Sequence, residues 1–174
     1  GDSPEGRYPR LDKIHLQTGE KKTVWTSPPS TYSQFVAFTG KDYATGIIRR
    51  ESKTEVPNYY LIDFGTGKET PLTQFADPAP ELTGIEKKLV RYKRADGVPL
   101  SGTLLLPPGY NGKEKLPLFI WAYPREFSDM STAGQVRGSE HTFTYLRGAD
   151  PRFFVLEGYA VLMDATMPVV GDPE

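Results

Sequence analysis

The sequence has 174 residues, of which 37% are hydrophobic and 25% are charged. With its 17 Gly included, the apolar share lies in the range of about 45 to 50% that is usual for folded domains, which excludes a wholly disordered chain. A formal net charge of -1 removes the electrostatic argument for binding nucleic acid or an anionic membrane surface. The chain has no Cys, so disulfides, a thiol nucleophile and Cys-based metal sites are excluded, and the compartment stays open.

Residues 1–80 are predicted to form short strands separated by tight turns. The segments Ile14–Lys21 and Ile62–Glu69 match in outline, each being a strand, a Thr-Gly turn and a polar strand start, at an offset of 48 residues. Two further apolar strands, Phe35–Phe38 and Ile47–Ile48, lie between the copies. A period of this size with several strands per unit predicts β-propeller blades, although fewer than two are present. The plainer alternative is two unrelated hairpins with common turns.

The segment 76–84 contains three closely spaced turn formers and is the predicted domain boundary, which divides the chain into domains 1–80 and 81–174. A hairpin turn is expected at Asp96-Gly97. Beyond it, Leu118–Tyr123 and Tyr159–Met163 are continuous apolar runs, typical of strands covered on both faces by helices. A short helix over residues 152–157, framed by the expected N-cap Asp150, precedes the second run. This order predicts a parallel crossover, and therefore the opening of an α/β sheet.

Several motifs in the second domain carry a family resemblance. The run DGVPLSGTLLLPPGY at residues 96–110, followed by KLPL at 115–118, resembles the entry into the catalytic domain of prolyl oligopeptidase family serine peptidases. Three further motifs look most like the glutamyl endopeptidase branch, namely WAYPREF at 121–127, AGQVRGS at 133–139 and MPVVG at 167–171. The resemblance implies the last strands of a β-propeller followed by the first strands of an α/β-hydrolase sheet, both incomplete.

The catalytic machinery that this resemblance implies is not in the sequence. An α/β-hydrolase raises its nucleophile on a G-x-S-x-G elbow after the fifth strand, and no such pentapeptide occurs among these residues. The sequence also lacks an initiator Met and an apolar leader. We therefore expect a piece of a longer peptidase that is catalytically inactive by itself. The intact enzyme is expected to cleave peptide bonds by acyl transfer after Glu or Asp. The alternative is a non-enzymatic, propeller-like module for protein interaction.

Three side chains are candidates for the active site of the longer protein. In relatives, a Tyr at the end of the third hydrolase strand donates its hydroxyl to the developing oxyanion, and Tyr123 stands at that place. The plainer interpretation is a rim Tyr with its hydroxyl in water. Arg125 and Arg137 are candidates for gripping an acidic substrate side chain, because a guanidinium binds a carboxylate in bidentate fashion. The alternative interpretation is that both are solvated loop arginines that form ion pairs with Glu126 or Glu140.

Other ligands and partners are expected to be few. Neither a metal site nor a cofactor motif is present, and the adjacency of His141 to Glu140 is not triad geometry. The longest apolar run, Leu118–Tyr123, is far shorter than the ~18 residues of a membrane span. The expected partner is a peptide substrate of the intact enzyme, and binding of nucleic acid is not expected. Because the fifth strand would be missing, we also expect one edge of Leu118–Tyr123 to be unpaired and prone to self-association.

Overall fold

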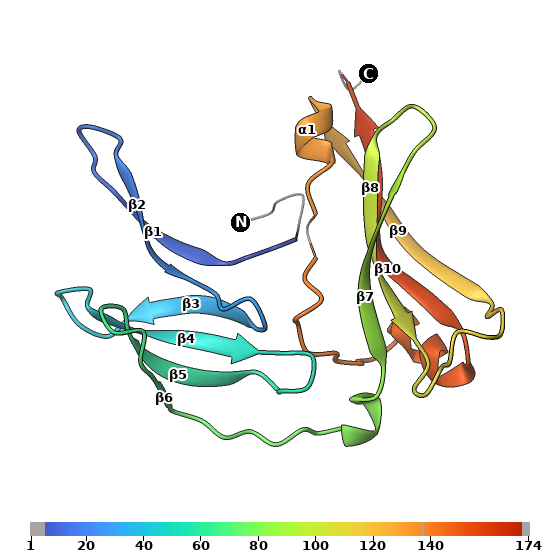
Figure 1. The fold of residues 1–174 in the computed structure, drawn as a ribbon, viewed down its shortest axis with the longest axis horizontal. Coiled ribbons are helices and arrows are strands. Elements are labelled where there is room, and N and C mark those ends of the chain that lie inside the picture. The colour runs from blue at the N-terminus through green and yellow to red at the C-terminus, as the bar shows by residue number, and fades with distance from the viewer. Residues whose placement is uncertain (1–5, 137, 172–174) are drawn as a thin grey trace. The chain divides into compact units, whose positions relative to one another are not determined.

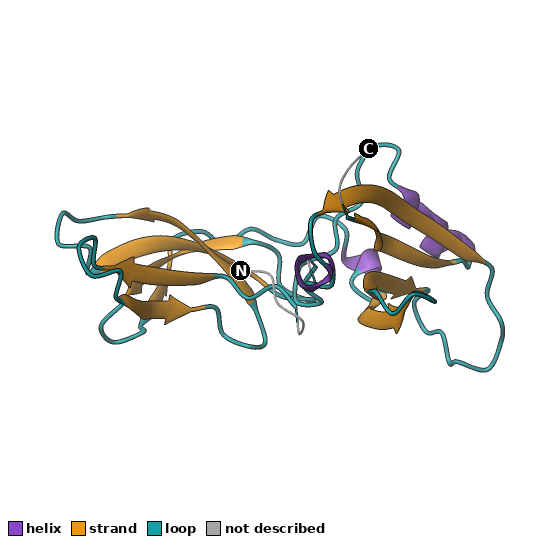
Figure 2. Cartoon of the chain, turned by 90° about the horizontal axis from the view of Figure 1, so that it is seen from above, coloured by secondary structure: helices purple, strands orange, loops and turns teal. Residues whose placement is uncertain are grey.

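The computed structural model describes residues 6–136 and 138–171, and the chain divides into two compact units. The first unit contains Tyr8–Pro78 together with the short segment His141–Phe143, and the second contains the rest of the described chain. Both units consist mainly of β-sheet, with few and short helices (Figure 2).

The first unit contains two antiparallel sheets. A two-stranded sheet pairs β1 with β2, and a four-stranded meander has the order β3-β4-β5-β6. The bounds of these strands are β1 Arg10–Ile14, β2 Lys21–Thr26, β3 Tyr32–Phe38, β4 Thr45–Glu51, β5 Asn58–Asp63 and β6 Glu69–Pro71. Gly46 and Ile48 of β4 and Ile62 of β5 are buried, with Ile48 and Ile62 at 0% and 1% exposure, and the pairing of Gly46 with Ile62 places all three on one face. The meander therefore has one apolar face, as alternation along a strand requires.

The two similar segments of the sequence form the same kind of turn. In the β1–β2 loop the N–H groups of His15 and Gly19 donate to the carbonyls of Glu20 and His15. In the β5–β6 loop, Asp63 and Gly67 make the same pair of bonds, and both glycines have a φ of +72°. The predicted hairpin turns are confirmed, and the β1–β2 hairpin corresponds to the β5–β6 hairpin.

The second unit contains a four-stranded mixed sheet of order β7-β8-β10-β9 (Figure 1). Its elements are η1 Pro80–Leu82, β7 Glu86–Lys93, β8 Pro99–Leu106, β9 Leu118–Phe127, α1 Met130–Ala133, η2 Pro151–Glu157 and β10 Ala160–Val170. β7 and β8 form the hairpin expected around Asp96-Gly97, and β8 pairs antiparallel with β10. β9 and β10 are parallel, so the predicted crossover between these strands is confirmed.

The helix that precedes β10 lies at the expected place but is a 3-10 helix. The carboxylate of Asp150 accepts from the backbone N–H of Arg152 at 2.9 Å, and Gly158 ends the helix with a φ of +82°. Val155 packs from this helix against Leu105 and Val161, and these three side chains are almost completely buried. Phe119 stacks on Phe154 at 4.8 Å between ring centroids, so η2 anchors the start of both parallel strands.

Two expectations about the parallel strands were wrong. β9 extends to Phe127 and β10 to Val170, well beyond the ends predicted at Tyr123 and Met163. In addition, β9 is not covered on both faces in the described part of the chain, because Leu118 and Ile120 are 52% and 55% exposed. β9 lies at the edge of the sheet and pairs only with β10 there.

Candidate active-site wall

Four alternate side chains of β9 line a hollow in the second unit. Because alternate residues of a strand share a face, Trp121, Tyr123, Arg125 and Phe127 all reach it. The hollow has a volume of about 450 Å³. Its other walls come from β7, β8, β10, α1 and the segments before β1 and after α1. Their residues are Arg7, Leu89, Ser101, Gly102, Thr103, Ala133, Gly138, Asp164, Ala165, Thr166, Met167 and Pro168. We call it the β9 hollow.

A β-bulge in β10 shapes one wall of the β9 hollow. The register runs from Leu162 opposite Ile120 to Ala165 opposite Ala122, so two residues of β10 lie opposite Trp121 alone. Asp164, the second of these, is exposed and has a φ of +51°, a conformation that Asp tolerates better than most residues. Asp164 therefore lies inside β10 and not at its end.

Beyond the bulge, a side chain continues the connection between β10 and β8. The hydroxyl of Thr166 accepts from the N–H of Ser101 at 2.7 Å and donates to the carbonyl of Ser101 at 3.1 Å. Ser101 is buried, so its backbone groups need protein partners. This pair fixes the wall between β8 and β10.

A further wall of the β9 hollow is the chain that leaves β9. Asp129 caps α1, accepting from the N–H of Thr132 at 2.8 Å, and hydrogen bonds led by that from the Ser131 hydroxyl lower the pKa of Asp129 to about 2. A Cβ at Gly134 would lie 2.4 Å from Pro99 Cγ, and one at Gly138 would lie 3.2 Å from Thr103 Oγ1. Small residues thus let this segment lie directly on β8.

The structure brings two of the three predicted site residues into this hollow. Tyr123 is 74% exposed, and neither its hydroxyl nor the Arg125 guanidinium has a hydrogen-bond or ion-pair partner among residues 6–136 and 138–171. Glu126, the expected alternative partner of Arg125, follows it on the strand and points to the opposite face. Arg137 lies outside the described residues. The arrangement therefore offers a hydroxyl donor and a cation to a bound group.

The two histidines of the sequence lie elsewhere. His15 is exposed and accepts from the N–H of Thr18 through Nδ1 at 3.3 Å, while His141 belongs to the first unit. Within the described ranges, no cluster of three or more His, Asp or Glu side chains is suited to a metal ion. The described chain also has no helix with the length and apolarity of a membrane span.

Sequence reasoning missed several residues of the hollow. Trp121 was noted only as part of a motif, and Thr166 and Ser101 were not singled out. The period-two spacing of Trp121, Tyr123 and Arg125 could have placed them on one face, because alternation requires only that the strand continue past Tyr123. The hydrogen bonds of Thr166 depend on the bulge and had no local signal.

Comparison with curated proteins gives two relatives along nearly the whole chain. The chain is 37% identical over 183 residues to a rice (Oryza sativa subsp. japonica) protein named "Probable glutamyl endopeptidase, chloroplastic", covering 99% of this chain and 20% of the relative. It is 34% identical to the Arabidopsis thaliana protein of the same name, covering 99% of this chain and 19% of the relative. The chain thus spans about a fifth of these proteins. No family model matches the sequence.

Solved structures of peptidases share the fold at low identity. Porphyromonas gingivalis dipeptidyl peptidase 4 matches 86% of this chain and 21% of its own, with a TM-score of 0.55 and 15% identity. A post-proline cleaving enzyme from Rickettsia typhi matches 90% of this chain and 21% of its own, with a TM-score of 0.53 and 14% identity. These matches show a shared fold, while the predicted resemblance to glutamyl endopeptidases is confirmed by the two sequence relatives. Both relatives are named as probable glutamyl endopeptidases.

Proposed function

We propose that residues 1–80 are the end of a β-propeller and residues 81–174 the opening of an α/β-hydrolase domain. The β3–β6 meander supports the first part, since a blade is a four-stranded antiparallel sheet. The β1–β2 hairpin, equivalent to β5–β6 at the 48-residue offset, then belongs to the preceding blade. The order β7-β8-β10-β9 supports the second part, because β9 and β10 are the one parallel pair among the described strands and a long connection joins them.

The longer protein is, in this proposal, a serine peptidase that cleaves peptide bonds by acyl transfer. The observation that carries it is the 37% identity to a glutamyl endopeptidase along 99% of the chain. The 174 residues contain no G-x-S-x-G elbow, so the chain by itself is inactive and the nucleophile comes from elsewhere in the parent. What residues 81–174 contribute is one wall of the substrate site.

Tyr123 and Arg125 take specific roles in this wall. The Tyr123 hydroxyl donates a hydrogen bond to the oxyanion that develops on the scissile carbonyl, a contribution of about 3 kcal/mol to transition-state stabilisation. The Arg125 guanidinium pairs with the carboxylate of a Glu or Asp substrate side chain, and Arg137 assists it. The exposed hydroxyl and unpaired guanidinium on alternate residues of β9 support these roles.

The test compares two peptides that differ in one group. Full-length protein is assayed with a fluorogenic peptide containing Glu and with its Gln counterpart, for the native protein and for Arg125→Ala. We expect the native protein to prefer Glu and the variant to lose that preference mainly through the Glu peptide. An equal kcat/KM for the two peptides in the native protein would refute the acidic specificity. An unchanged preference in Arg125→Ala would refute the role of Arg125.

A further inference from the structure

The last part of β10 is attached to the β7–β8 hairpin through side chains. Regular backbone pairing of β10 with β8 stops at Met163. Beyond it, the Thr166 hydroxyl bonds the backbone of Ser101, and Arg94 Nη1 donates to the carbonyl of Pro168 at 2.6 Å. Arg94 directly follows β7, which is not a neighbour of β10 in the described sheet. The Arg94 bond therefore reaches past β8 and joins two segments that are 74 positions apart in the sequence.

Asp96 holds the Arg94 guanidinium in the orientation that this bond needs. Its carboxylate accepts from Arg94 Nε at 2.9 and 3.0 Å and from Nη2 at 2.7 Å, which leaves Nη1 for Pro168. These hydrogen bonds are the main cause that lowers the pKa of Asp96 to about 2, so the carboxylate is charged at neutral pH. Because both side chains are partly exposed, the ion pair itself adds little stability. Its two-pronged geometry fixes the direction of the third nitrogen.

The β10 residues that these side chains hold lie opposite the two candidate site residues. In the parallel pairing of β9 with β10, Thr166 lies opposite Tyr123 and Pro168 lies opposite Arg125. β9 is an edge strand that pairs only with β10 in the described chain. The place of Arg125 in the sheet therefore depends on the place of Pro168, and both residues line the β9 hollow.

From this arrangement we infer that Arg94 is a positioning residue for Arg125. By holding the Pro168 carbonyl, Arg94 fixes the part of β10 against which the Arg125 segment of β9 is paired. Arg94 itself is not among the residues that line the β9 hollow, so it acts through β10 and not by touching a bound peptide. Its effect on the peptidase is on the choice of an acidic substrate, which rests on the proposed function. The restraint on β10 does not depend on that function.

Hydrogen exchange in the full-length protein tests the restraint. We expect Arg94→Ala to accelerate exchange of the backbone amides in 166–170 and 123–127 by about tenfold, because β10 loses a charge-assisted hydrogen bond there. Arg94→Lys keeps a cationic donor without the fork that Asp96 orients, and should retain part of the protection. The matched control is Lys88→Ala, which removes a cation of β7 that also pairs with a carboxylate two residues away, at 2.8 Å. It should leave both segments unchanged.

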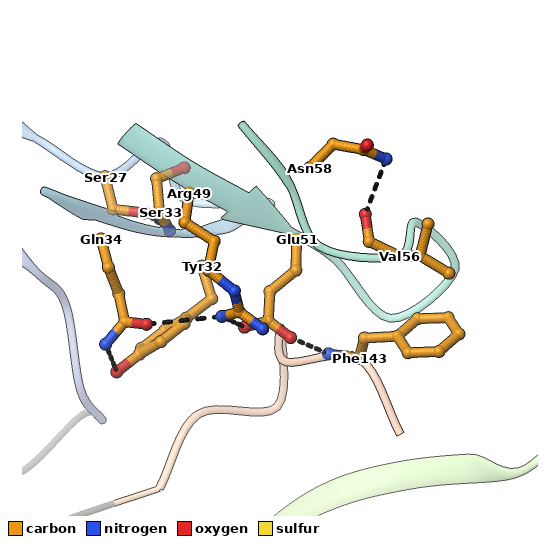
Figure 3. Close-up of polar contacts among 9 residues, drawn as sticks. All are labelled: Ser27, Tyr32, Ser33, Gln34, Arg49, Glu51, Val56, Asn58 and Phe143. Atoms are coloured by element: carbon orange, nitrogen blue, oxygen red, sulfur yellow. Dashed lines mark hydrogen bonds and ion pairs between the residues drawn. The ribbon is translucent and has the colours of Figure 1, made fainter. Parts of the chain in front are cut away.

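A second control is an arginine of the first unit that is held in the same way. Arg49 Nη1 lies 2.8 Å from Oε1 of Glu51, again two residues away, and 3.5 Å from Oε1 of Gln34 (Figure 3). The other carboxylate oxygen of Glu51 accepts from the backbone N–H of Phe143 at 2.7 Å. Arg49→Ala therefore removes an arginine–carboxylate pair whose described bonds lie within the first unit, and it should not change exchange in 166–170.

The exchange results decide the restraint whether or not the protein is a peptidase. Unchanged exchange of 166–170 and 123–127 in Arg94→Ala would overturn the positioning role. Equal acceleration of these segments in Lys88→Ala or Arg49→Ala would also overturn it, because the effect would then be a general loosening.

Peptide cleavage tests the link to Arg125. With the Glu peptide, Arg94→Ala should raise KM several-fold with kcat nearly unchanged, while both constants for the Gln peptide should stay near their native values. An equal effect on the two peptides, or no effect on the Glu peptide, would overturn the link. Absence of cleavage by the native protein would refute the proposed function, and the exchange data would still decide the restraint.

Discussion

The Thr166 hydroxyl serves Ser101 as a backbone group would, accepting from its N–H at 2.7 Å and donating to its carbonyl at 3.1 Å. In the described chain, the regular backbone pairing between β8 and β10 extends from Leu105 to Thr103. It stops there because the bulge at Asp164 follows in β10. One side chain thereby replaces two main-chain bonds. The sheet remains closed between β8 and β10 at the place where the β9 hollow begins.

The Thr166→Val variant tests whether the Thr166 hydroxyl replaces the missing backbone hydrogen bonds. Val has nearly the same shape but leaves the buried N–H and carbonyl of Ser101 without this partner. We expect a loss of about 1–3 kcal/mol in the free energy of unfolding, measured by urea denaturation. Thr166→Ser keeps the hydroxyl and should lose much less. Equal losses in the two variants would show that methyl packing, and not the hydroxyl, matters here.

The cap of η2 should respond to pH. Burial raises the pKa of Asp150, but the hydrogen bonds from Arg152 outweigh this and hold it below its ordinary value of 3.8. The stability that the cap contributes is therefore fully present above the unfolded pKa and is lost as pH falls through the lower folded value. Asp150→Ala should cost about 1 kcal/mol at neutral pH, measured by thermal unfolding.

Asp150→Asn is the matched variant, because it keeps an acceptor for the Arg152 N–H and removes the charge. Its stability should depend less on pH below 4 than that of the native protein. If the stability of the native protein and that of Asp150→Asn depended on pH in the same way, this explanation of the cap would be contradicted.

Removal of the Tyr123 hydroxyl tests the oxyanion role. In full-length protein, Tyr123→Phe should lower kcat by about 10²-fold to 10³-fold with little change in KM, because the bond forms only in the transition state. Folding should be unaffected, since the hydroxyl has no partner in the described chain. Tyr92→Phe removes a hydroxyl from β7 and should be silent. A Tyr123→Phe variant with native kcat would contradict the role.

The exposed edge of β9 should cause the 174-residue chain to associate. β9 pairs with β10 alone in the described chain, and Ile120 is 55% exposed on it. Light scattering should therefore detect oligomers, and Ile120→Lys should reduce them, because an edge lysine opposes strand addition. Leu16→Lys changes an exposed apolar residue in the β1–β2 loop and should have no effect. A monomeric native chain would contradict this prediction.

Local signals predicted several elements of the fold correctly. The hairpin at Asp96-Gly97 and the start of η2 at Asp150 follow from turn and cap chemistry, which acts over a few residues. The parallel pairing of β9 and β10 followed from two apolar runs and the long connection between them.

The errors came from the ends of the apolar runs and from distant contacts. The runs stop at Tyr123 and Met163, but both strands continue through polar residues and through Pro124 and Pro168. β9 is an edge strand, and β10 has lost its regular ladder with β8 before Pro168, so the missing N–H groups are tolerated. The Pro168 carbonyl even accepts from Arg94 Nη1 at 2.6 Å. The bond between Glu51 and Phe143 could not be predicted, because it spans 92 residues and neither side has a motif.

The most direct test of the central proposal is active-site labelling of full-length protein with a serine-reactive fluorophosphonate, followed by peptide mapping. The account predicts one labelled serine in a G-x-S-x-G elbow outside these 174 residues, and a slower labelling rate in Tyr123→Phe. A folded protein that takes up no label, or whose labelled serine lies within residues 1–174, would contradict it.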